Sequence, residues 1–140
     1  SSLYSFDQNH LQKFLDTKDC PNCDLSGADL SNKDLSGANL RSSNLTDVNF
    51  ENSTLVKANL WGANLKNANM NNTNARASNF TAAELINIKC DNTTFKGVNF
   101  ANANFEQVSC KDVSIWSANF LETTFLQMQG QHTQFLMMWI

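Results

Sequence analysis

A large apolar residue recurs at every fifth position of this chain, and no insertion breaks the register between residues 25 and 125. The series reads Leu25, Leu30, Leu35, Leu40, Leu45, Phe50, Leu55, Leu60, Leu65, Met70, Ala75, Phe80, Leu85, Cys90, Phe95, Phe100, Phe105, Cys110, Ile115, Phe120 and Phe125. A period of five matches neither an α-helix, at about 3.6, nor a continuous strand, at about two. The pattern therefore predicts a repeat architecture built from five-residue units.

The other positions of the unit have preferences of their own. A small residue usually stands two positions before the large one, as at Ala28, Ala38 and Ala58. Asparagine dominates the position just before the large residue: Asn39, Asn44, Asn49, Asn59, Asn64, Asn69, Asn74, Asn79, Asn99, Asn104 and Asn119. Residues two apart on an extended segment point to the same side, so the small and large residues face inward and the asparagine faces outward.

The two remaining residues of each unit must turn the chain, so that the next large residue also faces inward. Corners near a right angle would need about four units, or roughly 20 residues, to close a coil that stacks on the next by parallel pairing about 4.8 Å away. Residues 21–125 would then form about five coils, in a rod on the order of 25 Å long. This arithmetic alone allows a different number of sides.

The segments DLSGADL, DLSGANL, KANLWGANLKNAN and GVNFANANF resemble the A(D/N)LXX motif of the pentapeptide-repeat family, over about three quarters of the chain. The resemblance implies an all-β solenoid, a right-handed quadrilateral parallel β-helix whose axis is filled by Leu and Phe side chains. We expect three parts. They are a cap segment with a short helix (1–20), the β-helix of about five coils (21–125), and a degenerate last coil with an apolar cap (126–140).

Composition excludes several classes of protein. Asparagine accounts for 21 of the 140 residues, but an apolar content of 41% is enough for a core, so wholesale disorder is not expected. No apolar run is long enough to span a membrane. The net charge of −3 gives no electrostatic case for binding nucleic acid.

The N-terminal segment has the pattern of a short amphipathic helix. Leu11, Phe14 and Leu15 follow helical spacing, and Asp7 is a candidate N-cap. Because stacked coils leave an open edge at each end, we expect this helix to cover the first coil.

The C-terminal end is apolar at positions that face outward elsewhere in the chain. The candidate surface comprises Trp116, Leu121, Leu126, Phe135, Leu136, Met138, Trp139 and Ile140. Exposed apolar clusters mark interfaces or caps. Some members of the family dimerise through their C-terminal coils, so the resemblance favours a homodimer through this end. The alternative is a tail that folds back over its own last coil.

Two of the four cysteines, Cys90 and Cys110, occupy the large inward position one 20-residue coil apart. A Cα spacing of about 4.8 Å permits a disulfide, but parallel side chains would keep the Cβ atoms beyond the usual separation of about 3.8 Å. We therefore expect two stacked, buried free thiols that act as small apolar groups.

The other two cysteines, Cys20 and Cys23, form a CxxC motif where the cap meets the first coil. A zinc site would need two further ligands, and a thioredoxin-like motif expects a βαβ context, so we expect a disulfide, with free thiols as the alternative. The segment TKDCPNCDLSGADL resembles the opening of exported bacterial and thylakoid-lumen members of the family, which favours the periplasm or thylakoid lumen over the cytoplasm. No signal peptide is visible, and the chain lacks an initiator methionine.

No set of residues suggests catalysis, a metal site or a cofactor site. The two histidines, His10 and His132, lie in opposite end segments, and the carboxylates are scattered along the repeats. The most economical function is a non-enzymatic structural or protein-interaction rod with an unidentified protein partner.

The alternative function is topoisomerase binding by DNA mimicry, as in the quinolone-resistance branch of the family. Residues 21–125 hold ten acidic and eight basic side chains, so the rod is nearly neutral. DNA carries one charge per about 1.7 Å, so the charge balance argues against mimicry.

Overall fold

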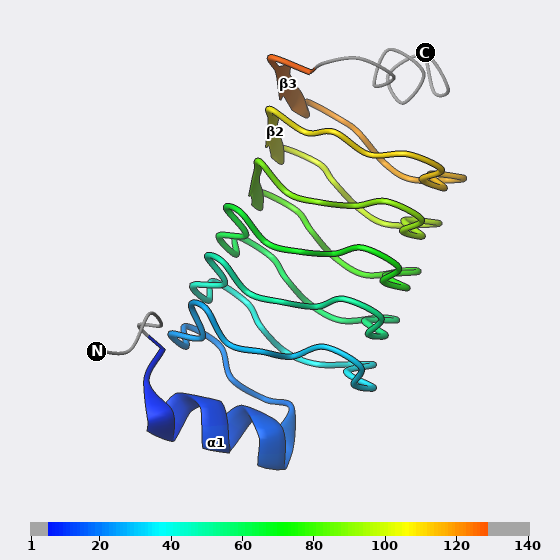
Figure 1. Cartoon of the computed structure of the whole chain (residues 1–140). Coiled ribbons are helices and arrows are strands. Elements are labelled where there is room, and N and C mark those ends of the chain that lie inside the picture. The colour runs from blue at the N-terminus through cyan, green and yellow to red at the C-terminus, as the bar shows by residue number, and fades with distance from the viewer. Residues whose placement is uncertain (1–5, 129–140) are drawn as a thin grey trace.

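The computed structural model describes residues 6–128. Within them the chain forms one helix, α1 (Gln8–Thr17), and three short strands, β1 (Glu84–Ile86), β2 (Asn104–Glu106) and β3 (Thr124–Leu126). The strands form one parallel sheet in the order β1-β2-β3. Figure 1 shows α1 at one end of a stack of coils, with β1, β2 and β3 one above another on the same side.

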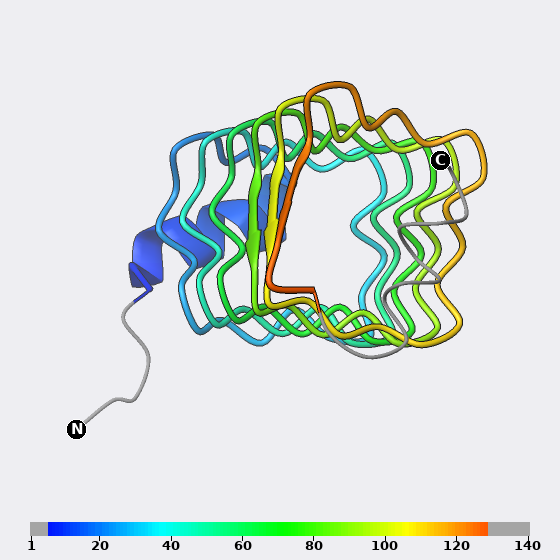
Figure 2. The same cartoon turned by 90° about the horizontal axis from the view of Figure 1, so that it is seen from above.

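Each coil contains 20 residues, because the backbone bridges join residues that are 20 positions apart. The bridges run up four faces, which begin with the pairs Asp19 and Asn39, Asp24 and Asn44, Asp29 and Asn49, and Asp34 and Thr54. Viewed along the stack, the coils have a four-sided outline (Figure 2). The number of sides that the five-residue period left open is therefore four.

The two residues after each large residue make the corner between two faces. The second of them has a left-handed backbone, with φ between 51° and 73°. The amide of the next residue often donates back to the carbonyl of the large residue, as Ala28 does to Leu25 at 3.0 Å. Asparagine and glycine adopt this conformation most readily. Corner asparagines with positive φ are Asn22, Asn32, Asn52, Asn67, Asn72, Asn87, Asn92 and Asn102, a second asparagine position that the sequence analysis did not separate.

The outward asparagine before each large residue holds the next corner. Its Oδ1 accepts a hydrogen bond from the backbone N–H two residues on, as Asn39 does from Arg41 at 3.2 Å. Aspartate does the same in the first coil, where Asp24 accepts from the N–H of Ser26 at 3.1 Å. The corner N–H needs only an acceptor oxygen, and both asparagine and aspartate carry one. This explains why either residue occurs at the position before the large residue.

Polar side chains also link one coil to the next. The amide of Asn119 donates to Oδ1 of Asn99, one coil below, at 3.2 Å. Inside the coil, buried hydroxyls donate to a carbonyl of the preceding coil, in the pairs Ser43 to Cys20, Ser53 to Leu30, Thr73 to Phe50 and Thr93 to Met70. Small hydroxyl residues therefore fit the inward position without leaving a polar group unpaired.

The large residues fill the axis of the rod, as predicted. Leu25, Leu40 and Leu60 are fully buried, and so is each Phe from Phe80 to Phe105. Aromatic rings stack from coil to coil in the upper half, with ring centroids 5.3 Å apart for Phe100 and Phe120 and 5.2 Å apart for Phe105 and Phe125. Such pairs add about 0.5–1.5 kcal/mol beyond the burial of their surface.

The helix α1 begins where the sequence predicted. Oδ1 of Asp7 accepts hydrogen bonds from the backbone N–H groups of Asn9 at 2.8 Å and His10 at 3.1 Å. The helix ends at Thr17, and its C-cap Lys18 is left-handed with φ 57° and donates its N–H to the carbonyl of Phe14. Local residues therefore determine both ends of α1.

The apolar face of α1 is narrower than predicted. Phe14 is fully buried and Leu11 is partly buried against the core, but Leu15 is 43% exposed. A helix of ten residues buries only one narrow stripe, which Leu11 and Phe14 occupy. In the part of the chain that the structure describes, no helix is long and apolar enough to cross a membrane.

Candidate functional site

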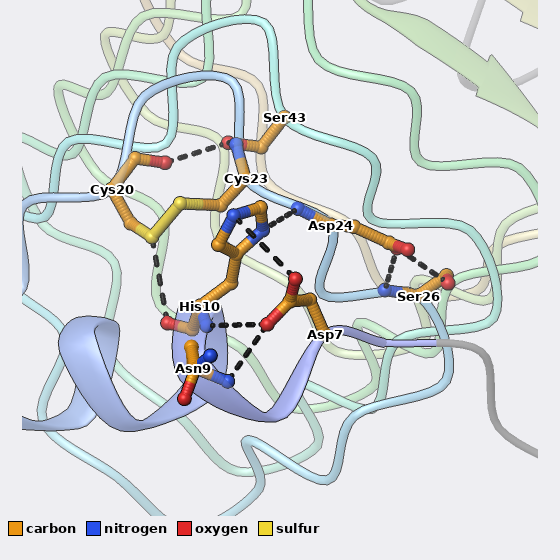
Figure 3. A network of polar contacts seen from close by, with 8 residues as sticks. All are labelled: Asp7, Asn9, His10, Cys20, Cys23, Asp24, Ser26 and Ser43. Carbon is orange, nitrogen blue, oxygen red and sulfur yellow. Dashed lines mark hydrogen bonds and ion pairs between the residues drawn. A yellow bond between two sulfur atoms is a disulfide. The ribbon is translucent and has the colours of Figure 1, made fainter.

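Hydrogen bonds attach α1 to the first coil through two residues of its N-terminal end (Figure 3). Nδ1 of His10 accepts from the backbone N–H of Asp24 at 2.9 Å, and the backbone N–H of Asp7 donates to the carbonyl of Asp24 at 3.0 Å. An imidazole nitrogen that accepts carries no proton, so the ring proton lies on Nε2, which is 3.9 Å from Oδ2 of Asp7. The sequence analysis missed this role, because no spacing pattern links His10 to Asp24.

Cys20 and Cys23 form a disulfide in the structure, as expected from the sequence, and their Cα atoms are 5.5 Å apart. Sγ of Cys20 lies 3.5 Å from the carbonyl oxygen of His10, which is a contact and not a hydrogen bond because a disulfide sulfur has no proton. The hydroxyl of Ser43 accepts from the N–H of Cys23 and donates to the carbonyl of Cys20. The disulfide and Ser43 together hold the first corner of the coil (Figure 3).

Cys90 and Cys110 also form a disulfide, and this corrects the prediction of two free thiols. Their Cα atoms are 5.0 Å apart, within the usual range for a disulfide. The sequence argument treated the two Cα–Cβ bonds as parallel. The disulfide forms at this Cα separation, so the assumption of parallel bonds was too restrictive.

Three carboxyl groups have lowered pKa values, and in each the cause is a local hydrogen bond that belongs to the fold. The backbone N–H of His10 holds the pKa of Asp7 below its ordinary value. Hydrogen bonds from Ser31 lower the pKa of Asp29, and those from Ser36 lower the pKa of Asp34. In residues 6–128, no group of three His, Cys, Asp or Glu side chains is placed to hold a metal ion.

The C-terminal apolar surface is only partly visible. Trp116 is 70% exposed, Leu121 is 64% exposed and Leu126 is 48% exposed, on successive corners of the last described coil. Five further residues of the predicted surface lie outside the described part of the chain: Phe135, Leu136, Met138, Trp139 and Ile140.

Among the described residues, Trp61 is the other exposed aromatic residue, and it packs between coils. The guanidinium of Arg41, one coil below, lies 4.5 Å from the centroid of the Trp61 ring. This geometry is a cation–π contact between neighbouring coils.

The sequence profile of the family described as pentapeptide repeats matches residues 19–55, 43–81 and 76–109, with 8 copies of the repeat. The chain belongs to the pentapeptide-repeat family. The match spans most of the coils, so the family assignment and the repeat β-helix support each other.

Solved structures of other pentapeptide-repeat proteins have the same fold. Rfr23 from the cyanobacterium Cyanothece 51142 aligns with a TM-score of 0.66 at 18% identity, over 84% of this chain and 97% of Rfr23. A protein of the Arabidopsis thaliana thylakoid lumen aligns with a TM-score of 0.57 at 20% identity, over 87% of this chain and 75% of that one. At these identities the likeness shows the fold alone.

QnrB1, a plasmid-mediated fluoroquinolone resistance protein, also matches, with a TM-score of 0.44 and 18% identity over 86% of this chain and 84% of QnrB1. This likeness is too low to carry an argument about function. No curated protein sequence matches the chain.

Proposed function

We propose that this pentapeptide-repeat protein is a non-enzymatic interaction module, a rigid rod that presents side chains to a protein partner. The observation that supports the proposal most is the exposure of three large apolar side chains, Trp116, Leu121 and Leu126, at one end of an otherwise polar rod. Large apolar groups left in water on a folded surface are typical of contact sites.

The proposal is tested by photo-crosslinking the full chain in cells of its source. A photoreactive amino acid is placed at Trp116 and, as a control, at Asn72, an exposed residue on another corner about two coils away. We expect a discrete protein adduct from position 116 and none from position 72. Turnover of a small-molecule substrate by the purified chain, without any such adduct, would overturn the proposal.

We further propose that this end forms a homodimer. The three exposed side chains lie on the last described coil, close to the end of the rod that a second copy would contact. The competing arrangement is a tail that folds over the same surface of its own chain. The homodimer would have twice the mass of one chain in solution, whereas the folded-back tail would leave a monomer.

We also propose that the protein works in an oxidising compartment, the periplasm or the thylakoid lumen, with the cytoplasm as the alternative. Two intramolecular disulfides support this proposal, because the reducing cytosol rarely preserves structural disulfides. Trapping thiols by alkylation in intact cells would show both pairs oxidised, and fully reduced pairs would contradict it.

We also propose that the coil is right-handed and that α1 caps its N-terminal end. A right-handed winding is supported by the strong preference of parallel strand crossovers for that hand. The proposed role of α1 as an N-terminal cap is supported by the burial of Phe14.

DNA mimicry toward a topoisomerase stays the weaker candidate. The charge count of the repeats is nearly balanced, and one corner of the rod carries cations without acids. A gyrase supercoiling assay tests it directly, and we expect no protection from quinolone by the purified protein.

A further inference from the structure

One corner of the coil carries cations and apolar residues on four successive coils. We define it as the basic corner: Val56, Lys57, Arg76, Lys96 and Trp116. Backbone hydrogen bonds place these residues one above another. The N–H of Lys57 donates to the carbonyl of Arg76 at 2.9 Å, that of Ala77 to Lys96 at 2.9 Å, and that of Gly97 to Trp116 at 2.8 Å.

The two faces that flank the basic corner carry no charged outward residue on the coils of its three cations, and Asp34 lies one coil below, under Thr54. On the coils of its three cations, the outward residues of the two flanking faces are Thr54, Asn74 and Thr94 on one side and Asn59, Asn79 and Asn99 on the other. Lys57, Arg76 and Lys96 are exposed, and none of them forms an ion pair with another described residue.

The cations at this corner are not explained by the stability of the rod. Arg76 and Lys96 are in register, 20 residues apart, and Lys57 is offset from Arg76 by one residue. Like charges on neighbouring coils repel, and the coil spacing of about 4.8 Å lies well inside the screening length of about 10 Å at 0.1 M salt. Elsewhere the chain avoids this arrangement: Arg41 stacks on Trp61, and the corner with Glu51 and Asp91 continues to Lys111.

The surface beside the cations is hollowed. A shallow depression of about 420 Å³ is lined by Val56, Lys57, Asn74, Arg76 and Ala77. At the other end of the corner Trp116 is 70% exposed, so an apolar platform follows the three cations.

We propose that the basic corner binds a short, extended, acidic segment of a partner protein. This inference rests on the proposed function as an interaction module and names the chemistry of the partner. Three coil steps from Lys57 to Trp116 span about 14 Å, which an extended chain covers with about four or five residues. Carboxylates of the segment pair with Lys57, Arg76 and Lys96, and an apolar residue at its end packs on Trp116.

A nucleic acid fits this surface less well than an acidic peptide. The corner is only two residues wide, and the chain as a whole carries a net charge of −3. A polyanion that extends past the corner meets the aspartates and glutamates of the other faces, whereas a short peptide does not.

The test uses the full chain and a fluorescein-labelled decapeptide that contains four glutamates, serine spacers and one leucine. Binding is followed by fluorescence anisotropy at about 0.05 M and about 0.15 M salt. A variant with Arg76→Glu and Lys96→Glu reverses two charges of the corner. The matched control, Lys66→Glu with Lys111→Glu, makes the same change of net charge at exposed positions on two other corners.

We expect the corner variant to lose at least about tenfold in affinity and the control to lose less than about threefold. Trp116→Ala should weaken binding of the leucine peptide but not of a version in which leucine is replaced by serine. Equal losses for both charge variants, no binding by the natural chain, or tighter binding of a single-stranded RNA of equal charge would overturn the inference.

Circular dichroism of each variant shows that the coil is intact. The proposed function has a separate readout, the photo-crosslinked partner. If the corner variant forms that adduct as well as the natural chain does, the module function stands and the acidic-segment inference fails.

Discussion

At the scale of single residues, the left-handed corner position is the most demanding one in the repeat. Residues other than glycine lose about 1–2 kcal/mol in this conformation. Many of the corners nevertheless use asparagine, whose short polar side chain reduces this cost, and a few use glycine. Alanine has neither advantage, so Ala77 and Ala82, with φ of 59° and 58°, are strained positions.

We expect Ala77→Gly to stabilise the protein by about 0.5–1 kcal/mol, because the gain in the folded corner exceeds the added freedom of the unfolded chain. In the matched change one coil above, Gly97→Ala at φ 70°, the new Cβ would lie 3.9 Å from the backbone of Ala77, an ordinary contact, so backbone strain alone should destabilise the protein by a similar amount. Urea unfolding monitored by circular dichroism measures both. A loss of stability in the first variant would contradict this account of the corner.

The aromatic stack makes Phe100 the residue whose truncation should cost most. Its ring is fully buried, and ring centroids of Phe80, Phe95, Phe105 and Phe120 all lie within 5.5 Å of it. We expect Phe100→Ala to lower the free energy of unfolding by about 3–5 kcal/mol, because it leaves a cavity that stacked coils cannot close.

Leu15→Ala serves as the control for this experiment, since Leu15 is 43% exposed on α1 and should change stability by less than about 0.5 kcal/mol. Similar effects in the two variants would show that the axis is not packed as described.

At the scale of elements, the start of α1 depends on the charge of Asp7. Its hydrogen bonds from the N–H groups of His10 and Asn9 hold the pKa of the carboxyl below the ordinary value of 3.8. A carboxyl whose folded pKa is depressed stabilises the fold above its unfolded pKa, and this contribution disappears as pH falls through the folded pKa.

We therefore expect the helical chemical shifts of residues 8–12 to weaken as the pH is lowered from 3.8. Asp7→Asn keeps an acceptor at the N-cap but cannot titrate, so its helical shifts should persist over the same range. If the natural chain and the Asp7→Asn variant lose their helical shifts over the same pH range, the loss is caused by a group other than Asp7.

The second element-scale prediction concerns the disulfide between two coils. Intact mass after alkylation in denaturant, without reductant, should show no modified cysteine, whereas two modified cysteines would restore the free-thiol interpretation of Cys90 and Cys110. Replacing both by alanine opens a loop with a sequence separation of 20, and by chain entropy should cost about 3 kcal/mol. This cost is measured as the difference in free energy of unfolding between the variant and the natural chain with its disulfides intact.

At the scale of the whole molecule, the question is how many chains assemble. Sedimentation velocity should give about twice the chain mass of 15.6 kDa if the C-terminal end forms the homodimer. Trp116→Glu with Leu121→Glu places charges in that surface and should give the single-chain mass. Leu15→Glu, at the opposite end of the rod, should leave the dimer unchanged, and a natural chain that sediments as a monomer at high concentration would exclude the dimer.

Much of the fold is visible in the sequence, because one repeated local rule builds it. The five-residue period identifies Leu25, Phe50 and Phe100 as axial residues, and Asp7 marks the start of the helix. These features depend on side-chain polarity and on hydrogen bonds between near neighbours, so the order of residues is enough to predict them. The outward asparagine before each large residue is predictable for the same reason, because its hydrogen bond is to the backbone two residues on.

The candidate sites depend on residues that are distant in sequence. The disulfide of Cys90 and Cys110 depends on how two side chains in neighbouring coils meet, and the bond from the Asp24 N–H to His10 depends on where α1 lies. The basic corner appears only after corners are aligned every 20 residues.

The sequence by itself determined which residues face inward and that the chain forms a coil. Only the tertiary structure decided the number of sides, and with it which residues meet, because the angle at each corner places every residue beside its neighbour one coil away.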